Sequence, residues 1–213
     1  RPGGAAGVAA MLAALGARVR LVGAVGEDRA GELLRQQLRE RDVDTSGIVT
    51  FSGRSTTVKT RYMGYVQSAG RSLQQMVRVD QEGCQPLRSR DADSILEKAS
   101  EETSSFLVVQ DMDKGLLSPP VVARLISRAR RSGRRVLVDP RCAEDYSGYR
   151  GAHYVVPNRR EAEMATGIGL NGLKAYRRAA RLLLDKLELE AAIITLDREG
   201  MFYATRYVQK EQV

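Results

Sequence analysis

Residues 106–139 read FLVVQDMDKGLLSPPVVARLISRARRSGRRVLVD, and this stretch decides the expected fold. Its two ends, Phe106–Val109 and Val136–Asp139, are short β-branched runs of the length and composition of buried strands. Between them, Val121–Arg131 has apolar residues at helical spacing, and Gly133 follows as a stop signal. A strand, a helix and a second strand in this order are typical of a crossover between parallel strands. The stretch therefore predicts an α/β protein.

The same rhythm extends along the rest of the chain. Helical spacing and short β-branched runs predict further elements, in order: helix Val8–Leu15, strand Val19–Val25, helix Gly31–Arg41, helix Ile95–Ser100, strand Tyr154–Val156, helix Arg160–Thr166, helix Leu173–Leu187 and strand Ala192–Leu196. We expect a mainly parallel sheet covered by helices on both faces. Ligands of such sheets collect at the carboxyl ends of the strands.

One segment departs from this rhythm. Ser55–Tyr62 and Gln75–Val79 alternate and are rich in Thr, Val and Tyr, as strands are, and the polar loop Gln67–Ser72 separates them. We interpret this segment as a small antiparallel β flap, or lid. It is expected as an insert over about residues 48–82 within one domain that spans residues 1–213.

The net charge and the apolar content of the chain limit the kinds of molecule that it could bind. The 213 residues carry a net charge of +8, which suits a nucleic acid, a membrane surface or an anionic small molecule. The run Arg128–Arg135 follows a helix and is expected to be a solvated helix end. Nucleic-acid binding would need exposed aromatic residues among these cations, and only Tyr62, Tyr65 and Tyr176 come close to that requirement. No stretch approaches the ~18 apolar residues of a membrane span, so we expect a cytoplasmic protein without nucleic-acid or membrane partners.

Two glycine-rich stretches could suggest ligand binding. Residues 167–172, GIGLNG, match the dinucleotide pattern GxGxxG, but a helix precedes them where the fingerprint needs a strand, so a helix-to-helix loop is expected. Residues 3–7, GGAAG, place small residues at a helix entry. There they allow either close approach of a polar ligand or close packing of the helix, and both interpretations stay open.

Several stretches together resemble the PfkB, or ribokinase-like, family of sugar kinases. After the opening Gly3–Ala9 with Gly16 and Gly26, the matching stretches follow in family order: 56–61 (TTVKTR), 74–80 (QQMVRVD), 111–115 (DMDKG), 138–140 (VDP), 149–152 (YRGA), 157–163 (PNRREAE) and 195–201 (TLDREGM). Within the family they are most similar to the heptose 7-phosphate kinases of ADP-heptose biosynthesis for the lipopolysaccharide core, often the first half of a bifunctional kinase/adenylyltransferase.

The resemblance implies a ribokinase-like fold and transfer of the γ-phosphate of ATP to a phosphorylated sugar, at C1 of D-glycero-D-manno-heptose 7-phosphate. It implies ATP and Mg²⁺ as cofactors, with a monovalent cation as an option, and a homodimer formed through the lid strands. Three alternatives stay open: another PfkB-type sugar or nucleoside kinase, a degenerate member that only binds sugar phosphate, and a basic nucleic-acid-binding module.

The resemblance also implies site residues. The substrate-binding residues are Gly3, Gly4, Gly7, Lys59, Arg61, Asp111 and Lys114. The ATP and Mg²⁺ residues are Asn158, Arg159, Arg160, Glu161, Thr195 and Gly200, with Glu161 acting on the metal through water.

Physical reasoning leaves other interpretations open for these residues. Lys59 and Arg61 share one face of a strand and could face an anion or simply solvent. Asp111 could instead cap a helix. Asn158 and Glu161 could form a capping box, alone or alongside a metal role.

The chain departs from the family pattern in four respects. Gly7 stands where the family has Asn, Met112 stands where an aromatic residue is usual, and Arg141 replaces a frequent Lys. The general base of the family is an Asp in a Gly-Ala-Gly-Asp motif, which is expected beyond Val213, so no catalytic base is assigned within this chain. The first strand of the family is expected upstream of Arg1. We therefore expect a fragment that is inactive alone.

Overall fold

The computed structural model describes residues 1–66, 72–101 and 104–206. The chain divides into two compact units, an amino-terminal unit, Arg1–Gln85, and a carboxyl-terminal unit, Pro86–Val213. The loop predicted over Gln67–Ser72 lies outside the described residues except for Ser72. No helix in the described part of the chain is long and apolar enough to cross a membrane.

Two helices and four short strands begin the amino-terminal unit: α1 (Gly4–Ala14), β1 (Val19–Arg20), β2 (Gly23–Gly26), α2 (Arg29–Arg39), β3 (Val43–Asp44) and β4 (Ile48–Phe51). The strand predicted over Val19–Val25 is divided into β1 and β2, because β1 pairs in parallel with β3 while β2 pairs in parallel with β4. Ala6, Ala9, Leu38 and Ile48 are buried together in the core of this unit.

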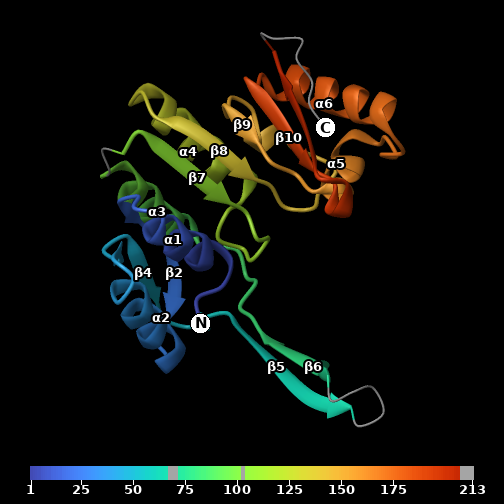
Figure 1. Ribbon diagram of the computed structural model, residues 1–213. Coiled ribbons are helices and arrows are strands. Elements are labelled where there is room, and N and C mark those ends of the chain that lie inside the picture. Colours follow the sequence, from blue (N-terminus) through green and yellow to red (C-terminus); the bar gives the residue numbers. More distant parts are fainter. Residues whose placement is uncertain (67–71, 102–103, 207–213) are drawn as a thin grey trace. The chain divides into compact units, whose positions relative to one another are not determined.

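A hairpin completes the amino-terminal unit. β5 (Val58–Val66) and β6 (Ser72–Gln81) pair antiparallel, with a bulge between Tyr62 and Met63 (Figure 1). This hairpin is the small antiparallel pair that the alternating pattern predicts. The insert predicted over residues 48–82 also includes β4, which pairs with β2 and so belongs to the body of the unit.

The carboxyl-terminal unit contains the remaining elements: α3 (Ser89–Ser100), β7 (Phe106–Gln110), α4 (Pro119–Arg131), β8 (Arg135–Asp139), η2 (Ser147–Tyr149), β9 (Tyr154–Val155), α5 (Arg159–Thr166), α6 (Leu173–Leu187), β10 (Ala191–Thr195), η3 (Asp197–Glu199) and β11 (Met201–Thr205). The strand order is β11-β10-β9-β8-β7 (Figure 1). β7 to β10 are parallel, which confirms the predicted parallel sheet, and β11 adds an antiparallel edge that the sequence pattern did not predict.

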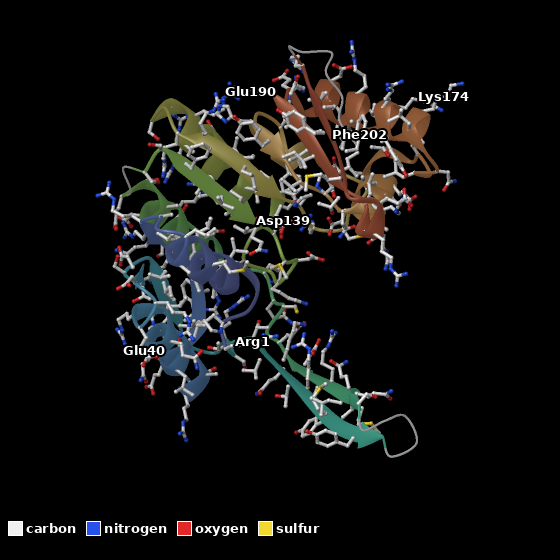
Figure 2. The ribbon with its side chains drawn as sticks, viewed as in Figure 1. Arg1, Glu40, Asp139, Lys174, Glu190 and Phe202 are labelled. Carbon is white, nitrogen blue, oxygen red and sulfur yellow. The ribbon has the colours of Figure 1, made fainter. Side chains whose placement is uncertain are left out.

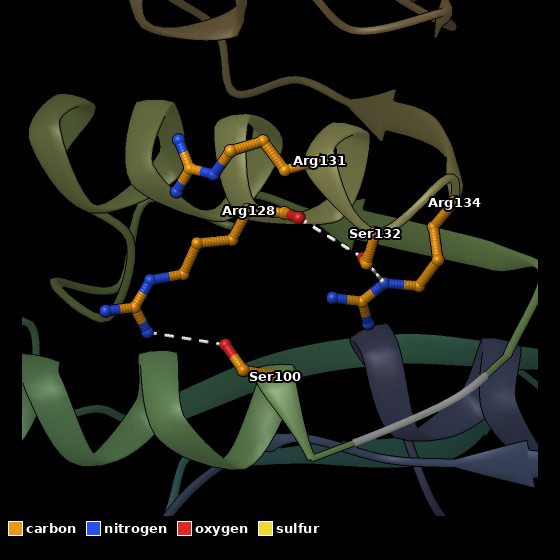
Figure 3. Close-up of a pocket in the computed structure, with 5 residues that line it drawn as sticks. All are labelled: Ser100, Arg128, Arg131, Ser132 and Arg134. Atoms are coloured by element: carbon orange, nitrogen blue, oxygen red, sulfur yellow. Dashed lines mark hydrogen bonds between the residues drawn. The ribbon is translucent and has the colours of Figure 1, made fainter.

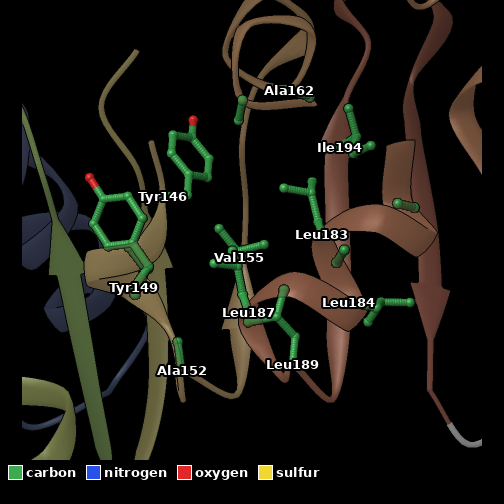
Figure 4. Close-up of a cluster of buried hydrophobic side chains, with 14 of the residues drawn as sticks. Tyr146, Tyr149, Ala152, Val155, Ala162, Leu183, Leu184, Leu187, Leu189 and Ile194 are labelled. Carbon is green, nitrogen blue, oxygen red and sulfur yellow. The ribbon is translucent and has the colours of Figure 1, made fainter. Parts of the chain in front are cut away.

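Helix α6 packs its apolar stripe against this sheet. Leu183 and Leu187 are buried on the helix, and Val155 and Ile194 face them from β9 and β10 (Figure 4). Phe202 of β11 is also fully buried (Figure 2). Each such side chain contributes about 1.5–3 kcal/mol to folding relative to full exposure, so this core holds the strand ends in fixed positions.

The loop over residues 167–172 joins α5 to α6, as predicted for this glycine-rich stretch. Gly167 ends α5 with φ 68°, and Gly172 begins α6 with φ 103°. Both are left-handed conformations that favour glycine. These glycines therefore serve two helix ends, and no strand precedes them as a dinucleotide fingerprint requires.

Candidate functional site

The carboxyl ends of the parallel strands gather polar side chains at one edge of the sheet. Asp111 follows β7, Asp139 ends β8, Asn158 follows β9, and Thr195 ends β10. The backbone N–H of Asp111 donates to the Asp139 carbonyl at 2.9 Å, and the N–H of Thr195 donates to the Pro157 carbonyl at 2.9 Å. These bonds extend the pairing of β7 with β8 and of β9 with β10 beyond the strand ends and fix the backbone at this edge, where Asp139 lies (Figure 2).

Asp111 is held tightly at this edge. Asp111 is buried, with 5% of its surface exposed. One carboxylate oxygen accepts from the Tyr149 hydroxyl at 2.8 Å, and the other accepts from the Asp113 N–H at 3.0 Å. Helix α4 begins only at Pro119, after the N-cap Ser118, so the helix-capping interpretation of Asp111 is wrong. Burial, together with the bond to Asp111, raises the pKa of Tyr149, which keeps its hydroxyl protonated as a donor.

The loop after β7 carries Lys114, which is half-buried. Asp113 in this loop has a φ of 52°, and its carboxylate pairs with the Arg141 guanidinium at 3.2 Å. The Arg141 N–H also donates to the Tyr149 hydroxyl at 3.3 Å. The Asp111–Gly115 loop is thereby joined to the loop that follows β8.

Asp139 and Glu161 form a pair of perturbed carboxyl groups. Burial raises the pKa of Asp139, although its Oδ2 accepts from the Gln110 amide at 3.1 Å. Burial also raises the pKa of Glu161, and the nearby charge of Asp139 raises it further. Two carboxyl groups whose charges repel each other suit a hard divalent cation, which favours oxygen ligands and compensates their charge. Asp139 was not among the predicted site residues, although an acid at the carboxyl end of a buried strand was a usable signal.

Asn158 and Glu161 form the capping box that their spacing predicts. Asn158 Oδ1 accepts from the Glu161 N–H at 3.0 Å, and the Asn158 N–H donates to Glu161 Oε2 at 2.7 Å. The box fixes the start of α5 and the orientation of both side chains. Their oxygens therefore stand at the sheet edge in a defined place, which fits a cation that keeps part of its water shell.

Of the remaining predicted nucleotide residues, Thr195 and Gly200 lie at the turn between β10 and β11, and Arg159 and Arg160 lie in the first turn of α5. Thr195 is half-buried, and Gly200 turns the chain with φ 92°. Arg160 is exposed, whereas the Arg159 guanidinium pairs with Asp197 and Glu199. Arg159 is thus already bound by two carboxylates, which the sequence pattern did not reveal.

The hairpin of the amino-terminal unit presents charged residues on one face. Lys59 lies opposite Asp80, and Arg61 lies opposite Arg78. Lys59 Nζ pairs with Asp80 at 2.8 Å and with Glu82 at 2.6 Å, and these bonds raise its pKa. Much of the Lys59 charge is therefore neutralised inside the hairpin.

Arg61 differs from Lys59 in its surroundings. Within the described residues, Arg61 has no ion pair or side-chain hydrogen bond, and the residue opposite it is another cation, Arg78. Arg78 pairs with Asp80 at 2.9 Å. Like charges directly opposite each other on two strands repel, and a bound anion would relieve that repulsion. Arg78 is a candidate that the sequence reasoning missed, because its place opposite Arg61 depends on the hairpin register.

The base of this hairpin is anchored by Asp28. Its carboxylate accepts from the Thr56 N–H at 2.8 Å and from the Gly31 N–H, at the start of α2, at 2.8 Å. The Thr56 hydroxyl accepts in turn from the Gly26 N–H at 2.9 Å. These bonds, with the Thr56 backbone bond as the largest cause, lower the pKa of Asp28. The network joins β2, α2 and the segment that leads into the lid.

The glycine-rich start of α1 has room around it. Gly3 is the N-cap of α1 and has no side-chain cap, and Gly4 has a φ of 53°. A Cβ atom placed on Gly3 would meet nothing within 4 Å, and one on Gly7 would meet only backbone atoms of Pro2, the nearer at 3.4 Å. Close packing therefore does not explain these glycines, and the free N–H groups of this helix end suit a polar ligand.

A cluster of arginines lies at the end of α4, where a solvated helix end was predicted. Arg128 donates to the Ser100 hydroxyl at 3.3 Å beside a cavity of about 270 Å³ (Figure 3). Arg134, which also lines this cavity, donates to the Ala99 carbonyl at 2.8 Å. The solvated interpretation is wrong for Arg134, which is 6% exposed. These cations serve the carboxyl ends of α3 and α4, where helix dipoles favour positive charge. Tyr176 is 5% exposed, so one of the three aromatic residues considered for nucleic-acid binding is buried.

Two curated proteins show the similarity of this chain to known sequences. The bifunctional protein HldE of Wolinella succinogenes is 38% identical over 201 residues, which are 93% of this chain and 41% of that protein. The HldE protein of Geobacter sulfurreducens is 37% identical over 203 residues, 94% of this chain and 40% of that protein. The chain thus spans about two fifths of the length of the curated relatives it matches.

Solved structures establish the fold as ribokinase-like. Escherichia coli phosphofructokinase-2 in complex with fructose-6-phosphate has a TM-score of 0.76 at 21% identity, over 99% of this chain and 66% of that chain. Arabidopsis thaliana ribokinase complexed with ribose and ATP has a TM-score of 0.74 at 16% identity, over 99% of this chain and 65% of that chain. The family model described as pfkB family carbohydrate kinase matches residues 1–213. The chain therefore belongs to the pfkB family of carbohydrate kinases.

Proposed function

We propose that this chain forms part of an ATP-dependent kinase that phosphorylates a phosphorylated sugar. The observation that carries the proposal is the sheet edge where Asp111 and the Asp139–Glu161 pair stand at the ends of parallel strands. Asp111 is positioned to accept hydrogen bonds from sugar hydroxyls, since its two oxygens are oriented by Tyr149 and Asp113. Lys114, on the same loop, supplies a positive charge near the phosphates.

The lid supports a phosphorylated acceptor. Arg61 and Arg78 lie opposite each other, and a phosphate group bridging two guanidinium forks would relieve their repulsion. Lys59 adds a weaker contribution because Asp80 and Glu82 already pair with it. With HldE proteins as the curated relatives, we take D-glycero-D-manno-heptose 7-phosphate as the substrate and its C1 hydroxyl as the acceptor, a step of ADP-heptose biosynthesis. The amino end of α1 would contact the sugar through Gly3, Gly4 and Gly7.

Residues at the other strand ends of the sheet would bind the nucleotide and its metal ion. Asn158, Glu161 and Asp139 would hold Mg²⁺, mostly through water, and Arg160, Thr195 and Gly200 would contact ATP. When bound, Mg²⁺ neutralises charge on the transferring phosphate. Catalysis then rests on positioning and charge stabilisation. None of residues 1–213 is assigned as the proton acceptor. A structure of E. coli phosphofructokinase-2 in complex with potassium supports a monovalent cation as a further cofactor.

The apolar residues of the lid support a homodimer formed through its strands. Tyr62, Val77 and Val79 of the hairpin are each more than half exposed, at 56%, 51% and 52%. A second copy of the lid would cover them and the open strand edges. Light scattering after gel filtration should give twice the protomer mass, and a monomer at micromolar concentration would refute this part of the proposal.

A second candidate function is binding of a sugar phosphate without turnover. Gly7 favours it, because the family has Asn there and the structure leaves space at this position. Losing an Asn removes one donor group and one acceptor from the sugar site.

ADP release by the full-length protein distinguishes these functions. The assay would supply Mg²⁺ and ATP with heptose 7-phosphate, fructose 6-phosphate or ribose in parallel. Turnover restricted to the heptose supports the proposal. Turnover on another sugar keeps the kinase and rejects the heptose substrate, and no turnover on any of them moves the non-catalytic function to first place.

A further inference from the structure

Arg159 connects the first turn of α5 to the turn between β10 and β11. Its Nε lies 3.2 Å from Asp197 Oδ2, and one terminal nitrogen lies 3.0 Å from Glu199 Oε1. The same terminal nitrogen donates to the Leu196 carbonyl at 3.3 Å, and the other donates to the Leu170 carbonyl at 2.6 Å. All three nitrogens of the guanidinium are therefore engaged with the protein.

Tyr176 contacts both Arg159 and Glu199 in this network. It is 5% exposed, and the centroid of its ring lies 5.9 Å from the Arg159 guanidinium carbon. Its hydroxyl donates to Glu199 Oε2 at 2.5 Å. Glu199 is therefore held by Arg159 and by Tyr176, and these bonds lower its pKa so that it stays ionised. A half-buried cation with two carboxylates and an aromatic ring is a well-defined arrangement.

Asp197 shows why the turn needs this support. Its φ is 55°, a left-handed conformation that is uncommon for residues other than glycine, although Asp adopts it more often than most. The side chains of Asp197 and Glu199 are 74% and 61% exposed. Two exposed carboxylates beside Thr195 and Gly200 would repel a polyphosphate unless a cation neutralised them.

We propose that Arg159 is a positioning residue that holds the Leu196–Gly200 turn in a neutralised, left-handed conformation able to accept a nucleotide, and that it does not bind the phosphates itself. This inference rests on the proposed function, because it assigns the turn to the nucleotide side. It replaces the direct ATP and Mg²⁺ role predicted for Arg159 from the sequence.

The test combines two measurements on the full-length protein. Amide hydrogen exchange without nucleotide reports the order of residues 196–200, and calorimetry with Mg·ADP reports the affinity. In Arg159→Met we expect exchange in the turn to be about 10-fold faster and Mg·ADP binding about 10-fold weaker. Arg159→Lys should fall between, since it keeps the charge but loses the fork. Arg181→Met, which breaks only the exposed Arg181–Asp185 pair on α6, should match the wild type in both measurements.

Three results would overturn the inference. Unchanged exchange in Arg159→Met would show that Arg159 does not order the turn, and weaker binding with unchanged exchange would make it a direct ligand. Faster exchange with unchanged affinity would remove the turn from the nucleotide site. If Arg159→Met does not fold, Arg159→Lys is judged by the same outcomes, because it loses the fork that bonds to both Asp197 and Glu199. A wild-type protein that does not bind Mg·ADP would refute the proposed function, while the exchange data would still decide whether Arg159 orders the turn.

Discussion

Tyr149 and Asp111 show how one buried hydrogen bond prepares a ligand group. The Tyr149 hydroxyl donates to Asp111 at 2.8 Å, and both residues are about 5% exposed or less. Tyr149 also packs edge-on against Tyr146, with ring centroids 5.1 Å apart. The aromatic pair keeps the hydroxyl in place, so the carboxylate stays oriented before any ligand arrives.

Replacing Tyr149 with Phe tests this bond. We expect Tyr149→Phe to lower the free energy of unfolding by about 1.5–3 kcal/mol, because the buried Asp111 carboxylate loses a donor. Urea denaturation measures the change. Tyr203→Phe, on the partly exposed β11, is the matched control and should change little. Equal effects of the two substitutions would contradict the account of Asp111.

Asp28 provides a pH-dependent test. Its pKa is lowered in the folded state, so its contribution to stability is present above its unfolded pKa of about 4 and is lost as the pH falls through the folded value. The free energy of unfolding should therefore decrease below about pH 4. Asp28→Asn should show a smaller decrease and lose about 1–3 kcal/mol at neutral pH, because its single amide oxygen can still cap α2 while its NH2 group cannot accept the hydrogen bond of the Thr56 N–H. An unchanged pH profile in this variant would contradict the network.

At the scale of elements, α5 combines a structural and a functional role in its first turn. Asn158 and Glu161 close the capping box, and the raised pKa of Glu161 shows that its charge is unfavourable in the folded chain alone. The capping box needs only an acceptor oxygen on the side chain of residue 161, whereas binding of a cation needs a negative charge on that side chain. The two roles can therefore be separated by mutation.

Two substitutions in α5 make that separation. Asn158→Ala should cost about 1 kcal/mol of stability through loss of the cap. Glu161→Gln keeps an acceptor oxygen and removes the unfavourable charge, so stability should stay within about 0.5 kcal/mol. In the full-length protein the same Glu161→Gln should raise the Mg²⁺ concentration needed for half-maximal activity at least about 10-fold. An unchanged Mg²⁺ requirement would place the metal elsewhere.

Elements with strong periodicity were the most predictable part of the fold. Helix Leu173–Leu187 has the predicted bounds, because its apolar stripe and the preceding Gly172 are local signals. The division of Val19–Val25 between two strand pairs was not predictable, since it depends on which partners β3 and β4 offer. The antiparallel edge strand β11 was missed for the same reason.

Residues of the candidate site were predictable where a short-range sequence pattern marks them. The Asn158–Glu161 box and the strand-end Asp111 follow from spacing and from position after a strand. The Lys59 pairing with Glu82 depends on side chains that reach across a bulged hairpin. The Arg159 network joins residues far apart in the chain, through tertiary contacts that no local pattern records.

At the level of the whole molecule, we propose that the lid recognises the phosphorylated acceptor and that the sheet edge recognises the nucleotide. Arg61 and Arg78 lie opposite each other on the hairpin of the amino-terminal unit, and Asp139 and Glu161 lie at strand ends of the carboxyl-terminal unit.

The most direct measurement compares kcat/KM of the full-length kinase for heptose 7-phosphate and for the same heptose without its phosphate. The account predicts that the wild type prefers the phosphorylated sugar by about 100-fold or more, and that Arg61→Met with Arg78→Met removes most of this preference while activity on the free heptose is little changed. A double variant that keeps the wild-type preference, or a wild type without one, would contradict the central claim that the lid cations recognise the phosphate of the acceptor.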